Sequence, residues 1–301
     1  MTGNRGLFIN GILFIVLCII WGSSFILIKE GIAHLSPYQV ATIRILSASL
    51  VLLPVAIQQW KNIPRNKLGY VFLSGLLGSF FPAYLFCLAE TRIDSSLAGF
   101  LNSLTPVVTI FTGLLFFGQV FQLHKLVGVF IAIGGMLVLL FAKGSVNMQF
   151  LSFASFALVA TVFYGLNINL VGRHLQQTSS LAVVAVGFAL LLIPCIIILW
   201  ITGYFSLPLA QKNILVSSGA SALLGIMGTA VATVLFYILI KRAGGLFASM
   251  VTYGIPFIAL SWGLLAGESI YKWQIVGLVV ILVGVYITTK KKQKEEVRGK
   301  K

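Results

Sequence analysis

Two apolar stretches of the chain each carry a stripe of small and polar residues around a proline. Aligned on their prolines, both stripes repeat at intervals of 3, 4, 3 and 4 residues, which places each set on one face of a helix. Hydroxyl and amide groups on such a face can hydrogen-bond a solute, and glycines let a second helix approach closely. The paired positions are Gly99, Asn102, Pro106, Thr109 and Gly113 in one stretch and Ser249, Thr252, Pro256, Ala259 and Gly263 in the other. We predict that these helices border a cavity and that the prolines loosen them as hinges.

Arg44 is the only charged residue well inside an apolar stretch. An arginine at the centre of a membrane helix costs roughly 2.5–3.5 kcal/mol. It lies seven residues beyond Pro37, which is about 10 Å along a helix. Two interpretations stay open at this point. The guanidinium either extends to the outer membrane surface, or faces a cavity where it binds a substrate carboxylate or pairs with Glu90 or Asp94.

Aromatic, hydroxyl and amide side chains in apolar stretches complete the predicted binding set. They suit amphipathic solutes that have an apolar face and one or two polar groups. The alternative is structural, because Ser and Thr often bond to their own helix and Trp and Tyr often anchor the membrane interface. The predicted substrate-binding residues are Trp21, Arg44, Asn102, Tyr164, Thr252 and Tyr253.

The sequence offers little that is typical of an enzyme. His34, His124 and His174 fall in separate connecting segments, without a cysteine or carboxylate pattern suited to a metal. No H-E-x-x-H or G-x-S-x-G motif occurs, and no carboxylate lies in the middle of an apolar stretch. We therefore predict neither catalytic activity nor a cofactor nor a metal site.

The composition requires a membrane protein. Of the 301 residues, 59% are hydrophobic and only 9% are charged, whereas soluble domains average about 25% charged residues. The net charge of +15 does not indicate nucleic-acid binding, because seven of the 21 basic residues lie in the tail 290–301 and most others in short loops. The lipid bilayer and a small solute are the predicted partners, and the oligomeric state stays open.

Ten apolar segments approach the ~20 residues that a helix needs to cross a bilayer. They cover residues 8–28, 37–57, 68–88, 95–117, 124–141, 150–170, 181–201, 213–240, 245–266 and 272–289. With the N-terminus inside, 15 basic residues fall on the inner side and five on the outer side. This bias predicts that both termini are cytoplasmic.

The proline helices belong to a longer internal repeat. Gly118-Gln119 matches Gly267-Glu268, and Leu126-Val127-Gly128 matches Ile275-Val276-Gly277. Because the repeat unit contains five helices, an odd number, the two copies must insert in opposite orientations. The predicted fold is all-α, with inverted repeats at 8–141 and 150–289 and a basic cytoplasmic tail at 290–301.

These residues also carry a family resemblance. The chain resembles the EamA-type domain of the drug/metabolite transporter superfamily. In the first copy the resemblance lies in the opening Trp21-Gly22-Ser23-Ser24, Lys29 and Arg44, the helix Gly99–Pro106, Gly118-Gln119 and Gly128–Gly135. Residues 213–289 resemble the second copy. The resemblance implies ten helices around a central cavity, in bacterial inner-membrane proteins that mostly export small metabolites, amino acids or toxic compounds. Two departures matter: Gln119 stands where the family often has Glu, and Arg44 has no basic counterpart in the second half.

We therefore predict a multi-pass inner-membrane (plasma-membrane) transporter, which exports amino-acid-like, carboxylate or amphipathic metabolites by alternating access around a mid-membrane cavity. The alternative is a membrane scaffold or lipid-handling partner that transports nothing. An enclosed cavity between the Asn102 and Thr252 faces would favour transport, whereas closed packing there would favour the scaffold.

Overall fold

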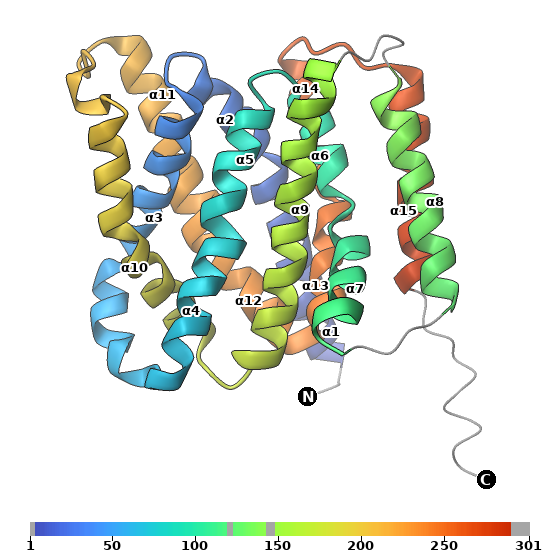
Figure 1. Cartoon of the computed structure of the whole chain (residues 1–301), viewed down its shortest axis with the longest axis horizontal. Coiled ribbons are helices and arrows are strands. Elements are labelled where there is room, and N and C mark those ends of the chain that lie inside the picture. Colours follow the sequence, from blue (N-terminus) through green and yellow to red (C-terminus); the bar gives the residue numbers. More distant parts are fainter. Residues whose placement is uncertain (1–3, 119–122, 143–147, 290–301) are drawn as a thin grey trace.

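The computed structural model describes residues 4–118, 123–142 and 148–289, which form a bundle of helices with no strand among them (Figure 1). Gln119 and the tail 290–301 lie outside the described residues. The helices are α1 (Asn4–Gly22), α2 (Ser24–Ile32), α3 (Pro37–Gln59), α4 (Leu68–Gly75), α5 (Phe81–Ala89), α6 (Ser95–Asn102), α7 (Thr105–Phe116), α8 (Leu123–Leu140), α9 (Met148–His174), α10 (Ser180–Ile201), α11 (Lys212–Leu223), α12 (Ala232–Ala243), α13 (Gly245–Ser249), α14 (Ile255–Leu265) and α15 (Lys272–Thr289).

Eight stretches in the described part of the chain are long and apolar enough to cross a membrane. They are Gly6–Ile32, Pro37–Asn62, Arg65–Ala89, Ser95–Phe116, Leu151–His174, Ser180–Ile201, Lys212–Ala243 and Gly245–Leu265. Helices α8 and α15, of 18 residues each, occupy the positions of the two further predicted spans. The total of ten spans stays a prediction.

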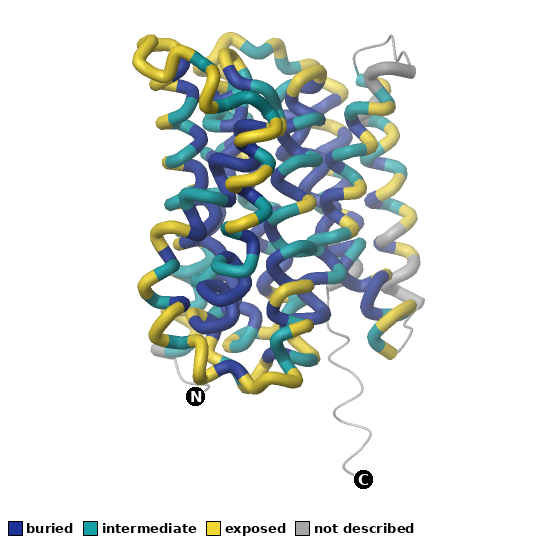
Figure 2. Tube along the Cα trace, turned by 60° about the vertical axis from the view of Figure 1, so that its left-hand side comes forward, coloured by how far each residue is buried: buried dark blue, intermediate teal, exposed yellow. Residues whose placement is uncertain are grey.

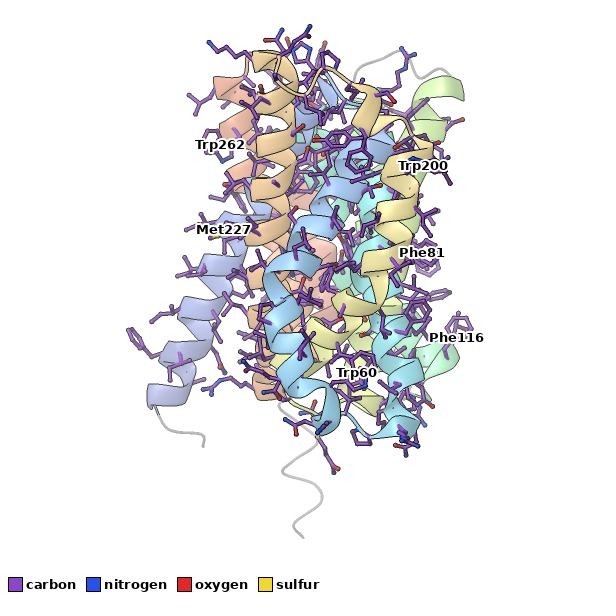
Figure 3. The ribbon with its side chains drawn as sticks, turned by 90° about the vertical axis from the view of Figure 1, so that its left-hand side faces the viewer. Trp60, Phe81, Phe116, Trp200, Met227 and Trp262 are labelled. Carbon is purple, nitrogen blue, oxygen red and sulfur yellow. The ribbon has the colours of Figure 1, made fainter. Side chains whose placement is uncertain are left out.

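The outer surface of the bundle is apolar along its sides. Phe116 is 67% exposed and Trp200 is 75% exposed, which would be unfavourable in water but suits contact with lipid. Trp60 lies near one end of the bundle and Trp200 and Trp262 near the other, with Phe81 between them (Figure 3). This distribution resembles the aromatic belts of membrane proteins. Buried residues are concentrated between the helices (Figure 2).

The helix directions define two ends of the molecule. Helix α1 begins and α15 ends at the same end of the bundle, whereas α9 begins at the opposite end (Figure 1). We call the end where α1 begins the inner end, since Lys61, Arg65, Arg173 and Arg242 lie in or beside segments that finish there. The opposite, outer end carries Glu90, which follows α5 directly.

Contacts between the first and second halves of the chain come in matching sets. Helix α3 packs on α10, α8 on α15, and α6 on α14. Helix α9 of the second half packs between α5 and α7 of the first, and α1 of the first half packs on α12 and α14 of the second. The first helix of each half, α1 or α9, therefore packs against two helices of the other half.

The two helices that carry the stripes around Pro106 and Pro256 are broken, where the sequence predicted continuous helices over 95–117 and 245–266. Helix α6 ends at Asn102 and α7 begins at Thr105, while a 3₁₀ turn, Met250–Tyr253, separates α13 from α14. The cause in the first case is Pro106, which has no N–H for the carbonyl of Asn102 and whose ring opposes a continuous helix. The hydroxyl of Thr105 donates to that carbonyl instead, at 2.7 Å. The break thus leaves its backbone satisfied inside the bundle.

Two other spans contain π-helical segments that the sequence did not predict. These are Leu76–Phe80, between α4 and α5, and Leu224–Val231, between α11 and α12. A π-helical turn shifts the backbone hydrogen bonds out of the regular α-helical pattern and is frequent at functional sites. Gly78 and Gly228, one from each segment, both border the central cavity described below.

Candidate functional site

A central cavity lies between the two halves of the chain. Its volume is about 60 Å³, which holds about four water molecules at the ~15 Å³ that each requires. Residues of α1, α2, α3 and α6 contribute from the first half, and residues of α9 and α12 from the second. The lining residues are Trp21, Ser24, Phe25, Ile28, Arg44, Gly78, Ser79, Phe86, Asn102, Thr105, Tyr164, Asn167, Ile168, Gly228, Thr233, Phe236, Tyr237 and Thr252.

Arg44 places a positive charge in this cavity. Its side chain is only 7% exposed, and its Nε donates to Oγ1 of Thr229 at 2.7 Å. Helix α3 holds this arginine tightly against the π-helical segment, since a Cβ at Gly225 would lie 2.3 Å from the Arg44 carbonyl oxygen. The guanidinium is therefore held inside the bundle and does not extend to the outer surface. Its pairing with Glu90 is not formed, because Glu90 Oε2 accepts a hydrogen bond from Ser95 Oγ and Oε1 has no partner among the described residues.

Aromatic groups from both halves surround the arginine. The indole N–H of Trp21 donates to the carbonyl of Gly228 at 2.9 Å, so a first-half side chain bonds to the second-half π-helical segment. The ring of Trp21 also contacts Phe236 edge to face, with centroids 4.8 Å apart. On the other side, the rings of Tyr164 and Phe86 stack with centroids 6.1 Å apart. A solute in this cavity would meet aromatic faces and one fixed cation.

The polar residues of the broken helices meet at the cavity. Asn102 is the last residue of α6 and Thr252 lies in the turn before α14, and both side chains line it. The small residues of the same stripes have another role, because a Cβ at Gly99 would lie 2.9 Å from the Cβ of Ala259. A Cβ at Gly263 would lie 2.6 Å from Glu268 Oε2. The stripes therefore pack α6 closely against α14 and its following loop, while Asn102 and Thr252 line the cavity.

The structure brings together five of the six predicted substrate-binding residues. Trp21, Arg44, Asn102, Tyr164 and Thr252 line the cavity, whereas Tyr253 is not among the lining residues. The predicted hinge positions Pro106, Pro256, Gly99, Gly113 and Gly263 are likewise absent from the lining, and they lie in or beside the broken helices. Substrate contact and hinge motion both stay predictions.

Among the lining residues, Thr233 and Tyr237 of α12 were not identified from the sequence. The amide of Asn167 donates to the hydroxyl of Tyr237 at 3.0 Å, and a Cβ at Gly78 would collide with that amide. Tyr237 and Thr233 lie on α12, a helix whose apolar pattern carries no stripe comparable to that of the proline helices. The sequence feature that could have pointed to them is Gly78, because the absence of a side chain there permits this close approach.

A second cavity opens towards the inner end. Its volume is about 270 Å³, and Thr109, Asn169, Arg173 and Gly245 are among the residues that line it. Ile168 borders both cavities and packs on Gly245, where a Cβ would lie 2.7 Å from its side chain. Ile168 is thus a side chain that the two cavities share.

The outer end is closed by contacts between the halves. Glu268, in the loop after α14, accepts hydrogen bonds from the backbone N–H groups of Ser95 and Ser96 at 3.0 and 3.2 Å and from Ser96 Oγ at 2.9 Å. These bonds satisfy free N–H groups at the start of α6, where a negative charge is favourable. The carboxylate of one half thus caps a helix of the other half, above the central cavity.

A bundle of membrane-crossing helices around a central cavity, with polar groups from both halves and a second cavity at one end, defines a multi-pass membrane transporter. The EamA-like transporter family model matches residues 9–141 and 151–290, so the chain belongs to that family. It is a multi-pass protein of the inner membrane.

Similar proteins include transporters from bacteria and an archaeon. Proteins of Salmonella typhimurium and Escherichia coli, each described as a probable amino-acid metabolite efflux pump, are 28% identical over 92% of this chain and 94% of their own. An uncharacterized transporter of Archaeoglobus fulgidus is 24% identical over 90% of this chain and 95% of its own. A crystal structure with 16% sequence identity superposes with a TM-score of 0.64 over 93% of this chain and 96% of that chain, which shows the fold alone.

Proposed function

We propose that this transporter exports small amino-acid-like, carboxylate or amphipathic metabolites. The observation that carries the proposal is Arg44, a buried cation that lines the central cavity beside Trp21 and Tyr164. An arginine can bind a carboxylate through two parallel hydrogen bonds, while aromatic rings accept an apolar side chain. The bacterial relatives named as probable amino-acid metabolite efflux pumps support the same substrate class.

The proposed architecture is ten membrane-spanning helices in two inverted repeats, residues 8–141 and 150–289, followed by a cytoplasmic tail. Three observations support it. The family model matches the chain twice, α1 and α9 begin at opposite ends of the bundle, and the contacts between halves come in matching sets. Inverted repeats of this kind place the substrate site where the halves meet.

The proposed mechanism is alternating access. A central cavity of about 60 Å³ is too small for a metabolite, since small-molecule sites in proteins are roughly 300–1,000 Å³. The cavity must therefore widen to admit its substrate. Two observations support a cycle in which the two ends open in turn. The inner end has the larger cavity, which Ile168 also lines, and at the outer end Glu268 accepts hydrogen bonds that join the two halves.

The test is counterflow in liposomes that contain the purified full chain. Liposomes preloaded with an unlabelled amino acid should accumulate the same labelled amino acid transiently and saturably, and protein-free liposomes should not. Asn102→Leu, which adds an apolar side chain to the cavity, should reduce the flux, whereas Phe116→Leu on the lipid-facing surface should leave it unchanged. The absence of counterflow across a panel of amino acids, carboxylates and amphipathic amines would refute the transport proposal.

A further inference from the structure

The outer end of the molecule contains two carboxyl groups in very different environments. Both touch Ser95, the first residue of α6: its backbone N–H donates to Glu268 and its hydroxyl donates to Glu90 Oε2 at 2.8 Å. Glu268 accepts three hydrogen bonds in all and is partly exposed. Glu90 is 0% exposed, and its Oε1 has no hydrogen-bond partner among the described residues.

An ionised Glu90 would be unfavourable in this arrangement. A buried charge needs an opposite charge and a full set of hydrogen bonds, and among the described residues one carboxylate oxygen of Glu90 has no hydrogen-bond partner. Burial accordingly raises the pKa of Glu90 well above its ordinary value of 4.5, and the nearby Glu268 carboxylate raises that pKa further. The Ser95 hydroxyl, the Lys29 ammonium on α2 and the Arg44 guanidinium on α3 act in the opposite direction and lower it. The closed outer end therefore favours the neutral carboxyl.

The position of Glu90 connects its proton to the closure of the outer end. It follows α5 directly, one helical turn beyond Phe86, which lines the central cavity. Lys29 does not neutralise its carboxylate; the ammonium approaches the backbone carbonyls of Glu90 and Ile93 at 3.4 and 3.5 Å. Separation of α6 from Glu268 would move Ser95, which Glu90 and Glu268 share, and would admit water to the Glu90 carboxyl.

We propose that Glu90 is a proton-binding site of the outer gate, which we define as Glu90, Ser95, Ser96 and Glu268. The gate closes only after the Glu90 carboxylate has taken up a proton from the outer solution, and it releases that proton when it opens. This inference rests on the proposed alternating access, because it requires an outer end that opens.

The pH dependence follows by linkage. The closed gate binds the proton more tightly than the open, hydrated gate, in which the pKa of Glu90 approaches its ordinary value of 4.5. Between that value and the raised pKa of the closed gate, the closed gate holds more protons than the open one. Increasing pH through this window therefore shifts the population from closed to open, and acidification shifts it back.

The experiment measures the distance across the outer gate as a function of pH. Spin labels at cysteines introduced for Thr91 and Ser269, both exposed, report the separation of the α5–α6 and α14–α15 loops in the full chain in lipid nanodiscs. The three native cysteines are buried. We expect a short distance at acid pH and a growing population of longer distances as pH rises.

Two variants and one control separate Glu90 from other titrating groups. Glu90→Gln is neutral at every pH and should keep the short distance throughout. Ser95→Ala removes a hydrogen bond that favours the ionised form, so the midpoint should move to higher pH by about 1 unit. Glu30→Gln, an exposed carboxylate at the same end, should behave like the wild type.

The outcomes distinguish this inference from the proposed function. A pH-independent distance in a protein that shows counterflow would overturn the proton site and leave transport intact. A pH response that persists in Glu90→Gln would also overturn it, and if that variant does not fold, an unshifted midpoint in Ser95→Ala has the same consequence. Absence of counterflow together with a fixed distance would overturn both proposals.

Discussion

Replacement of Arg44 by glutamine is the sharpest test of the proposed binding site. The guanidinium lines a small central cavity in a side chain that is only 7% exposed, and its Nε is already bonded to Thr229. A substrate carboxylate would bind through its other N–H groups, where it would compete with the hydroxyl of Tyr164. A hydrogen bond to a charged group contributes about 1.5–3 kcal/mol, so Arg44→Gln should weaken the binding of a carboxylated substrate about 10- to 150-fold. The uncharged amide of the same substrate should lose less than about threefold, because no carboxylate is present to be left unpaired.

The assay compares the two ligands in one preparation. Half-maximal concentrations for counterflow of an amino acid and of its amide are measured in liposomes containing wild type, Arg44→Gln or Arg44→Lys. Lysine keeps the charge but loses the planar guanidinium group and the Thr229 contact. The half-maximal concentration of the amino acid should therefore be intermediate between those of the wild type and Arg44→Gln. Size-exclusion profiles and thermal unfolding in detergent control for misfolding. Equal losses for the acid and the amide would refute the reasoning, since a structural defect affects both alike.

Three further predictions concern the packing and closure of the bundle. Gly225→Ala should lower the Tm by an amount equivalent to about 1–3 kcal/mol, because its Cβ would lie 2.3 Å from a backbone oxygen. The control Gly11→Ala, in α1 and with nothing within 4 Å, should not lower the Tm, because alanine favours a helix over glycine. Equal losses of Tm in the two variants would contradict this packing. Pro106→Ala should reduce counterflow more than the yield of purified protein, because alanine favours a continuous helix across the break. Parallel losses of flux and yield would exclude a specific role of Pro106 in transport. Glu268→Gln should weaken the closure of the outer end, because it removes the negative charge that caps the start of α6. The distance between spin labels at positions 91 and 269 should then be longer than in the wild type at the same pH. An unchanged distance would show that this charge does not hold the gate closed.

The sequence alone was sufficient to establish the class of the protein and much of the candidate site. A chain with 59% hydrophobic and 9% charged residues has too few polar groups for a water-soluble surface, so its apolar stretches must lie in lipid. The stripes around Pro106 and Pro256 led to Asn102 and Thr252, both of which line the cavity. The depth of Arg44 marked it as unusual, because a charge in an apolar helix requires a compensating environment.

The contacts between the halves could not be read from the sequence. Whether Arg44 reached the outer surface or the cavity depended on Thr229, which lies in a π-helical segment of the other half. No periodicity predicts a π-helical segment, because its wider turns are stabilised by tertiary contacts and not by residue type. The same limit applies to the break after Asn102, which proline made favourable but which Thr105 and the surrounding helices position.

What the sequence by itself determined was local or compositional: apolar lengths, the charge bias that predicts an orientation, and residues whose burial needs a reason. The tertiary structure alone decided which of those residues meet. Glu90 and Glu268 look alike in the sequence, yet Glu90 is buried with one oxygen that has no hydrogen-bond partner in the described part of the chain, and Glu268 caps α6 from across the interface. The physical reason is that solvation and hydrogen bonding depend on groups far away along the chain, which only the folded molecule brings within reach.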